Sequence, residues 1–278
     1  MGNINWLASY PKSGNTWIRI FLANLMANNA QPVNINQLQD FSIASNRETF
    51  DELSGLSSSD LTLEEIERLR PLVYEIQSDN ATEKIFLKIH DAYIYTCDGI
   101  PLVSTRATNK ALYIIRNPLD VAVSFAHHLG ATHEKAVENM CNEHFAFCNK
   151  NLKLHKQLEQ KLLSWEKHVL SWTSQQNIPV KVVRYEDLLH FPEITFTSIV
   201  EYFELDYGKS QILSAIQNSS FSELKKQEET HGFIEKSPQA KSFFRKGKAG
   251  LGKDELGAEL SNKIIASNER VMRQFGYL

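Results

Sequence analysis

The segment YPKSGNTW, residues 10–17, decides the fold of this chain. The apolar run INWLAS (4–9) comes before it and leads to a proline, and the residue before a proline favours extended backbone. After the glycine, the run NTWIRIFLANLM (15–26) places apolar residues at helical spacing. The segment is therefore predicted to join a strand to a helix through a loop whose backbone N–H groups can hold an anion. Lys12 precedes the glycine, so the nucleotide-loop pattern G-x-x-x-x-G-K-[ST] is not matched.

The rest of the chain alternates apolar runs with helical patterns. Runs typical of buried strands are KIFLKIH, KALYIIR and PVKVVRY, at residues 84–90, 110–116 and 179–185. Helical patterns occupy residues 60–72, 117–129, 133–173, 192–205, 210–218 and 255–275. The first of these helices should begin at Ser59 or Asp60 and end near Pro71. The alternation predicts an α/β fold with a central parallel sheet flanked by helices in three layers, α/β/α, as a single domain over residues 1–278.

The composition is that of an ordinary globular protein. Of 278 residues, 42% are hydrophobic and the net charge is −3, so the chain has no general attraction to nucleic acid or to an anionic membrane, and neither partner is expected. Three cysteines, an odd number, do not indicate a disulfide framework. No apolar run reaches the about 20 residues that span a bilayer, and the first residues lack the pattern of a signal peptide. We therefore expect a cytoplasmic protein with no transmembrane segment.

Two further segments carry groups that suit an anion. In RNPLDVAVS (116–124), Arg116 ends a predicted strand, and Ser124 follows two helical turns later on the same face. The segment SFFRKGKAGLGKDE (242–255) is locally basic in a slightly acidic chain, and its glycines suggest a mobile loop that closes over an anion. Taken alone, the first segment would favour a surface arginine beside a helix cap, and the second a solvated basic loop.

The strand at 84–90 carries a lysine and a histidine on one face. Lys88 and His90 are two residues apart, so both side chains point the same way while Ile89 can face the core. Histidine titrates near neutral pH and suits the removal of a proton from a hydroxyl group. A histidine on a strand is more often structural, and the lysine beside it favours the catalytic interpretation.

In their order along nearly the whole chain, these segments resemble the cytosolic sulfotransferases, a family that uses 3′-phosphoadenosine 5′-phosphosulfate (PAPS) and has a P-loop-like fold. YPKSGNTW resembles the family's 5′-phosphosulfate loop, RNPLDVAVS its 3′-phosphate motif and RKGKAG its distal basic loop. The segment LKIH falls where the family has its lysine–x–histidine strand. Three further stretches also match, SWEKHVLSW (164–172), VVRYEDLL (182–189) and SSF (219–221).

The resemblance implies a role for each matching residue. The 5′-phosphate would be bound by Lys12, which also contacts the bridging oxygen, and by the backbone of Ser13, Gly14, Asn15 and Thr16. The adenine would pack on Trp17 and Phe221, with Tyr185 and Ser219 beside it. The 3′-phosphate would be bound by Arg116, Ser124, Arg245, Lys246 and Gly247. His90 would be the general base, with Lys88 and Lys12 beside the transferring group. The resemblance further implies a small-molecule hydroxyl acceptor and 3′-phosphoadenosine 5′-phosphate (PAP) as product. No metal is required, and the chain contains no HExxH, paired CxxC or EF-hand pattern.

Departures from the family limit these expectations. Many members have D-W-K after the second glycine of the distal loop, and this chain has LGK, which leaves loop closure and the usual dimer contact open; we expect a monomer or a weak homodimer. Asn15 stands where a hydroxyl is common. Residues 30–80, 91–106 and 127–160 match no family motif and should form the acceptor pocket. The chain as a whole looks most similar to bacterial members acting on natural products or lipids, but the identity of the acceptor does not follow from the fold.

Two other classes of protein share part of this pattern. A nucleotide kinase or NTPase of the P-loop type would also place a loop between a strand and a helix, but it would have a GK[ST] and a magnesium-binding aspartate at a strand end. A non-catalytic nucleotide-binding protein would be favoured if Lys12 or His90 were replaced, and both are present.

Overall fold

The computed structural model describes residues 2–149 and 154–278, and the chain separates into two compact units. The first unit contains Met1–Tyr10, Asp40–Tyr113 and Asn142–Val182, and the second contains Pro11–Gln39, Ile114–Cys141 and Val183–Leu278. Segments of the two units alternate along the chain. The expected single domain over 1–278 stays a prediction.

The first unit is built on a four-stranded sheet with the order β2-β1-β3-β6. Its strands are β1 (Ile4–Ser9), β2 (Ile85–Ile89), β3 (Thr108–Ile115) and β6 (Val180–Arg184), and the last residues of β3 and β6 belong to the second unit. β1 and β2 run parallel, with Ile4 opposite Ile85 and Ala8 opposite Ile89. All six residues of β1 are buried, which explains why its sequence is apolar throughout rather than alternating. The central parallel sheet predicted from the sequence is confirmed.

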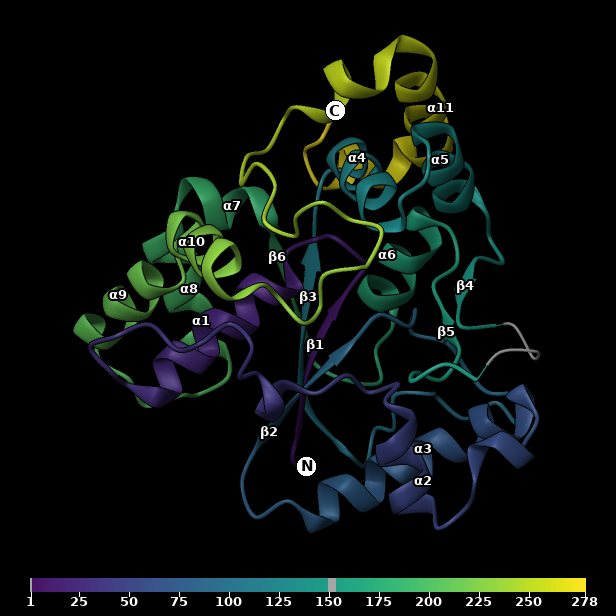
Figure 1. The fold of residues 1–278 in the computed structure, drawn as a ribbon. Helices are drawn as coiled ribbons and strands as arrows, with labels where there is room; N and C mark the ends of the chain where they lie inside the picture. The colour runs from purple at the N-terminus through teal and green to yellow at the C-terminus, as the bar shows by residue number, and fades with distance from the viewer. Residues whose placement is uncertain (1, 150–153) are drawn as a thin grey trace. The chain divides into compact units, whose positions relative to one another are not determined.

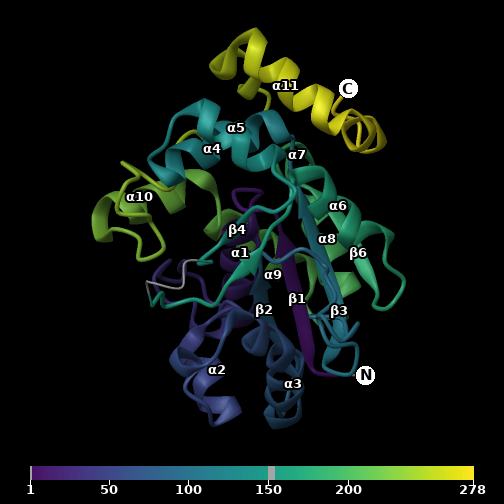
Figure 2. The same cartoon turned by 90° about the vertical axis from the view of Figure 1, so that its right-hand side faces the viewer.

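Helices and two short strands complete the first unit. They are α2 (Arg47–Ser54), η2 (Ser58–Asp60), α3 (Leu63–Asn80), α6 (Trp165–Ser174), β4 (Ala146–Phe147) and β5 (Gln160–Lys161). α2 and α3 lie side by side (Figures 1 and 2), where Phe50, Ile66 and Val73 form an apolar cluster with Leu158. η1 (Gln39–Phe41) lies at the boundary between the units.

The second unit is mainly helical. Its helices are α1 (Asn15–Ala27), α4 (Pro118–Leu129), α5 (His133–Cys141), α7 (Tyr185–His190), α8 (Pro192–Tyr202), α9 (Lys209–Asn218), α10 (Phe221–His231) and α11 (Gly252–Gln274). α11 packs on α4 and α5, whereas α1 packs on α9 (Figure 1). Phe21 of α1 meets Phe196 of α8, with ring centroids 4.2 Å apart. α1 and α4 are therefore packed against other helices of the second unit.

Two helix predictions were wrong. The helix expected to end near Pro71 begins later, at a capping box formed by Thr62 and Glu65, and continues through the proline to Asn80. Val73 and Tyr74 are buried on the far side of Pro71, so packing outweighs the break in the hydrogen-bond pattern. The helical region expected at 133–173 is two helices, because α5 ends at Cys141 and α6 begins only after Ser164, which caps it. Residues 150–153 lie outside the described residues.

In residues 2–149 and 154–278, no helix is both long enough and apolar enough to cross a membrane. Across the same residues, no group of three or more His, Cys, Asp or Glu side chains is placed to hold a metal ion.

Candidate functional site

The loop after β1 forms a cradle at the N-terminus of α1. Gly14 has φ 108°, and a methyl group added there would lie 2.7 Å from the ring of Tyr185, so the backbone can take this path only with glycine. Lys12 also has a positive φ, 70°. Ser13 is 1% exposed, and its Oγ has no hydrogen-bond partner within the described part of the chain. A buried hydroxyl without a partner is costly, so this cradle is suited to a bound acceptor such as a phosphate oxygen.

The first turn of α1 adds a second hydroxyl group to the cradle. Thr16 Oγ1 accepts a hydrogen bond from Arg19 Nη2 at 3.1 Å, which leaves its hydroxyl hydrogen available to another acceptor. The two Glu235 oxygens accept from the same guanidinium at 2.8 and 2.6 Å and fix its position. Asn15, the first residue of α1, is 4% exposed.

Aromatic rings lie beside this loop. The ring of Trp17 meets Tyr185 edge-on, with centroids 5.8 Å apart, and meets Phe196 at 5.5 Å. The guanidinium of Arg116 lies 4.2 Å from the centroid of the Tyr185 ring. Burial raises the pKa of the Tyr185 hydroxyl, whereas the nearby Arg116 opposes that change. The phenol therefore stays protonated at neutral pH and can donate a hydrogen bond.

Arg116 connects the loop after β1 to the distal basic loop. Its Nη1 donates to the carbonyl oxygen of Lys12 at 3.2 Å, and its Nη2 donates to that of Lys248 at 3.3 Å. α4 begins directly after it, within the range 117–129 that the sequence predicted, with the side chain of Asn117 accepting from the N–H of Leu119 and Pro118 in the first turn. Ser124 lies in α4 and is partly exposed.

The distal basic loop is held against α10 and α4. Gly247 has φ 59°, and a methyl group added there would lie 2.4 Å from the ring of Phe221. Asp120 accepts hydrogen bonds from the N–H groups of Gly250 at 2.8 Å and Gly252 at 2.7 Å. Phe243, at the start of this loop, lies with its ring centroid 4.0 Å from Lys12 Nζ. The loop after β1 and the distal basic loop are therefore in contact, through Lys12 of the first and Phe243 of the second.

Two of the expected phosphate ligands contact a carboxylate in this structure. Glu255, in the first turn of α11, accepts from Arg245 at 2.8 Å and from Lys246 at 3.0 Å. The hydrogen bond from Arg245 is the main cause that lowers the pKa of Glu255 to about 2. Ser219, expected beside the adenine, is fully buried and donates its hydroxyl to the carbonyl of Ala215 at 2.8 Å. Neither Asp120 nor Glu255 was expected at the site.

His90 and Lys88 lie in the first unit, on and just after β2. Leu87 and Ile89 are buried while Lys88 and His90 are partly exposed, which confirms the expected alternation. His90 Nδ1 lies 2.8 Å from the carbonyl oxygen of Ser9. A carbonyl oxygen can only accept, so Nδ1 carries the hydrogen and Nε2 carries the lone pair of the neutral ring. This tautomer is the one that a general base acting through Nε2 requires.

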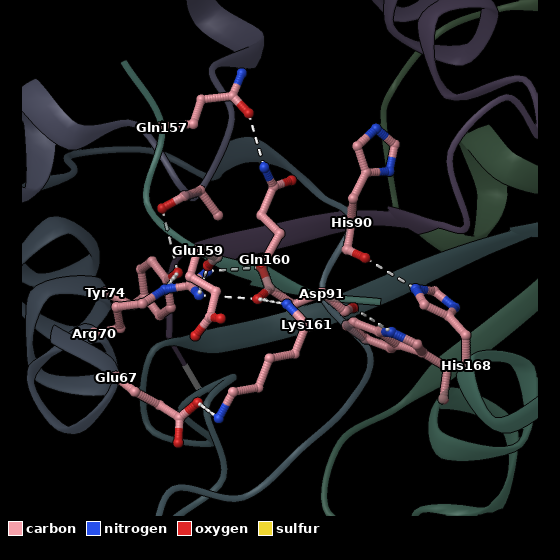
Figure 3. A network of polar contacts seen from close by, with 12 residues as sticks. Glu67, Arg70, Tyr74, His90, Asp91, Gln157, Glu159, Gln160, Lys161 and His168 are labelled. Carbon is pink, nitrogen blue, oxygen red and sulfur yellow. Dashed lines mark hydrogen bonds and ion pairs between the residues drawn. The ribbon is translucent and has the colours of Figure 1, made fainter. Parts of the chain in front are cut away.

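The backbone that follows His90 is fixed by a buried polar network (Figure 3). The Asp91 carboxylate pairs with Arg70 through two hydrogen bonds of 2.9 and 2.7 Å, and both side chains are almost fully buried. Asp91 also accepts from the N–H of Lys161 at 3.2 Å and, through its carbonyl oxygen, from Trp172 Nε1 at 3.0 Å. In Figure 3 the imidazole of His90 points away from this carboxylate.

His168 supports the same strand end from α6. Its Nε2 lies 3.0 Å from the carbonyl oxygen of His90, and its Nδ1 lies 2.8 Å from the hydroxyl of Tyr113. The carbonyl requires the hydrogen on Nε2, so the hydroxyl donates to Nδ1 and the ring is neutral. Burial lowers the pKa of His168 to about 4. His168 is therefore a structural histidine at neutral pH, and the match of SWEKHVLSW to the family gave no signal of this role.

The stretches expected to form the acceptor pocket are spread over both units. Residues 91–106 lie in the first unit, whereas 30–80 and 127–160 each contribute to both. Within the last stretch, residues 150–153 lie outside the described residues. The acceptor pocket stays a prediction.

Comparisons with known proteins agree with the resemblance. The chain is 24% identical to cytosolic sulfotransferase 12 of Arabidopsis thaliana, over 97% of this chain and 77% of that protein. It is 25% identical to flavonol 3-sulfotransferase of Flaveria bidentis, over 93% of this chain and 78% of that protein.

Solved structures of sulfotransferases share the fold. A mouse sulfotransferase complexed with PAP superposes with a TM-score of 0.61 at 20% identity, covering 98% of this chain and 84% of that one. Retinol dehydratase in complex with androsterone and PAP also reaches 0.61, at 19% identity, over 97% of this chain and 80% of that one. The family model of the sulfotransferase domain matches residues 5–276. The chain therefore belongs to the sulfotransferase family.

Proposed function

We propose that this sulfotransferase transfers a sulfuryl group from PAPS to a hydroxyl group of a small molecule, with His90 as general base. The observation that carries the donor assignment is the cradle of the second unit, where Ser13 has a buried hydroxyl without a partner in the described chain. Gly14 and Gly247 permit close approach at positions where any side chain would collide with an aromatic ring. Both structural relatives named above contain PAP, which supports the same donor.

Each group of residues would have a separate task. The N–H groups at the start of α1, with Ser13 and Lys12, would hold the 5′-phosphate and neutralise its charge. Arg116 would hold the 3′-phosphate, and the rings of Trp17 and Phe221 would pack on the adenine. The bound donor supplies an activated sulfuryl group whose leaving group is a phosphate. Sulfuryl transfer resembles phosphoryl transfer in needing neutralised oxygens and in-line positioning more than protein covalency.

His90 would remove the proton of the acceptor. As the acceptor oxygen bonds to sulfur and the bond from sulfur to the phosphate oxygen breaks, the hydroxyl proton passes to Nε2 of His90. The hydrogen bond of Nδ1–H with the Ser9 carbonyl supports this role, because it stabilises the imidazolium that forms. The partly exposed Lys88 on the same face would add positive charge beside the transferring group.

The acceptor is proposed only as a hydroxylated small molecule. The name of the Flaveria bidentis relative specifies such an acceptor for that protein. A cytoplasmic location and a monomeric or weakly dimeric state complete the proposal. The cytosolic relative and the three free cysteines favour the location.

Calorimetric titration tests the donor, and one substitution tests the base. We expect the protein to bind PAP tightly and ADP with magnesium weakly; the reverse order would favour a P-loop kinase instead. His90→Ala should bind PAP as the unmodified protein does and lose turnover by at least about 10²-fold. His231→Ala, which changes an exposed histidine at the end of α10, should leave both unchanged. Turnover of His90→Ala near that of the unmodified protein would remove His90 as the base.

A further inference from the structure

The two cations of the distal basic loop bind the same carboxylate. Arg245 donates through Nη1 to Glu255 Oε2 at 2.8 Å and through Nη2 to Oε1 at 3.3 Å. Lys246 Nζ donates to Oε1 at 3.0 Å. Both terminal nitrogens of the guanidinium and the ammonium group therefore face an anion supplied by the chain itself. This is the geometry in which Arg and Lys hold a phosphate.

A lowered pKa keeps Glu255 an anion at any pH near neutrality. Its hydrogen bonds with Arg245 and Lys246 oppose protonation and lower its pKa to about 2. The pair of cations thus has a net charge of one positive unit instead of two at any pH near neutrality.

The backbone beneath Glu255 is fixed, so only its side chain can move away from the cations. Asp120 accepts from the N–H groups of Gly250, two residues before α11, and of Gly252, its first residue. A methyl group added at Gly252 would lie 2.3 Å from the backbone of Leu119, so this part of the chain is in close contact with α4. The Glu255 side chain is 24% exposed, which leaves it room to turn toward solvent.

We propose that Glu255 is an internal competitor for the 3′-phosphate of the nucleotide. Its carboxylate binds Arg245 and Lys246 until the 3′-phosphate displaces it. The displaced carboxylate stays close and repels the bound phosphate. The inference rests on the proposed function, which assigns these two cations to the 3′-phosphate. PAPS and PAP carry the same 3′-phosphate, so Glu255 weakens the binding of both and favours release of the product.

Removal of the Glu255 charge should strengthen nucleotide binding. In Glu255→Gln the phosphate meets two cations without a competing carboxylate, and its repulsion from a nearby negative charge disappears. The variant also loses the ion pairs that position Arg245 and Lys246 before the nucleotide binds. The free energy lost in this way is small, because ion pairs between partly exposed side chains stabilise little. We expect about five- to tenfold tighter binding of PAP, from a Coulomb interaction partly screened by solvent.

The test compares two nucleotides and two variants by calorimetry. PAP and adenosine 5′-phosphate differ in the 3′-phosphate, and the variants are Glu255→Gln and Asp254→Asn. Asp254 is an exposed carboxylate in the same helical turn, so its variant controls for the change in net charge. We expect only Glu255→Gln to bind PAP more tightly, with the affinity for adenosine 5′-phosphate unchanged in both. Thermal melts of the two ligand-free variants should coincide within a few degrees.

Each contrary result has a separate meaning. Weaker or equal PAP binding by Glu255→Gln would overturn the inference and make Glu255 a residue that positions the cations. An equal gain in Asp254→Asn would also overturn it, because a general charge effect would then explain the gain. If the unmodified protein bound PAP no more tightly than adenosine 5′-phosphate, the assignment of the 3′-phosphate site would itself be wrong, and the inference would fall with it.

Discussion

The buried neutral His168 should make the protein sensitive to mild acid. Its ring is fully buried between the carbonyl oxygen of His90 and the hydroxyl of Tyr113, an arrangement that fits the neutral tautomer. Burial lowers its pKa from 6.5 to about 4. The unfolded chain therefore binds a proton between these values that the folded protein does not, so the free energy of unfolding decreases as the pH falls below 6.5.

The size of this effect follows from the two pKa values. One pKa unit corresponds to about 1.4 kcal/mol, so His168 should reduce the free energy of unfolding by about 3 kcal/mol between pH 7 and pH 4. Most of the loss, about 2 kcal/mol, should already be present at pH 5. That is a large part of the about 5–15 kcal/mol that stabilises a typical domain.

Urea unfolding at pH 7, 6, 5 and 4.5 measures the effect in paired proteins. His168→Gln keeps an amide that can donate to the His90 carbonyl but cannot titrate, so its stability should depend less on pH across this range. His144→Gln replaces an exposed histidine and should follow the unmodified protein. Carboxylates titrate in all three proteins, so their contribution cancels in the comparison. Parallel curves for His168→Gln and the unmodified protein would refute the reasoning.

Two further substitutions give opposite kinds of result. Ser13→Ala should raise or preserve the stability of the ligand-free protein, because a buried hydroxyl without a partner in the described chain is removed, while calorimetry shows weaker PAP binding by about 1 kcal/mol. Stronger PAP binding by this variant would contradict the assigned cradle. Asp91→Asn should lower the free energy of unfolding by about 3–5 kcal/mol, because it leaves the buried Arg70 charge uncompensated. Glu138→Gln, which breaks the exposed ion pair with Lys135, should lower the free energy of unfolding by less than about 1 kcal/mol in the same urea experiments. Equal losses of stability in Asp91→Asn and Glu138→Gln would contradict the argument.

The sequence predicted the four strands of the sheet because each is a short apolar run, although only Val183 of β6 is buried. β2, β3 and β6 end at Ile89, Ile115 and Arg184, each directly before a residue expected at the site. The helical pattern at 117–129 also predicted α4, in which Asn117 and Pro118 supply a cap and a first turn. Periodicity failed where tertiary packing decides, as in α3, whose buried residues carry the helix through Pro71.

The candidate site was predicted only in part, and the reason is physical. Motifs placed Gly14 and Gly247, and the structure shows the aromatic ring that each must avoid. The carboxylates that bind the basic loop, Asp120 and Glu255, were missed, because a carboxylate that binds backbone N–H groups or cations nine or more residues away leaves no periodic pattern. Asp120 had one signal, its position in the first turn of α4, but that signal indicates a helix dipole as readily as a loop anchor.

The alternation of the two units along the chain limits how this enzyme can be divided or recombined. Each unit consists of three separate chain segments, so any contiguous fragment that contains one unit complete also contains segments of the other. The residues assigned to the donor belong to the second unit, and His90 belongs to the first. Exchange of one complete unit with that of a homologue, as a single continuous segment, would also exchange parts of the other unit. Changes of acceptor are therefore easier to engineer by replacing loops within a segment than by exchanging modules.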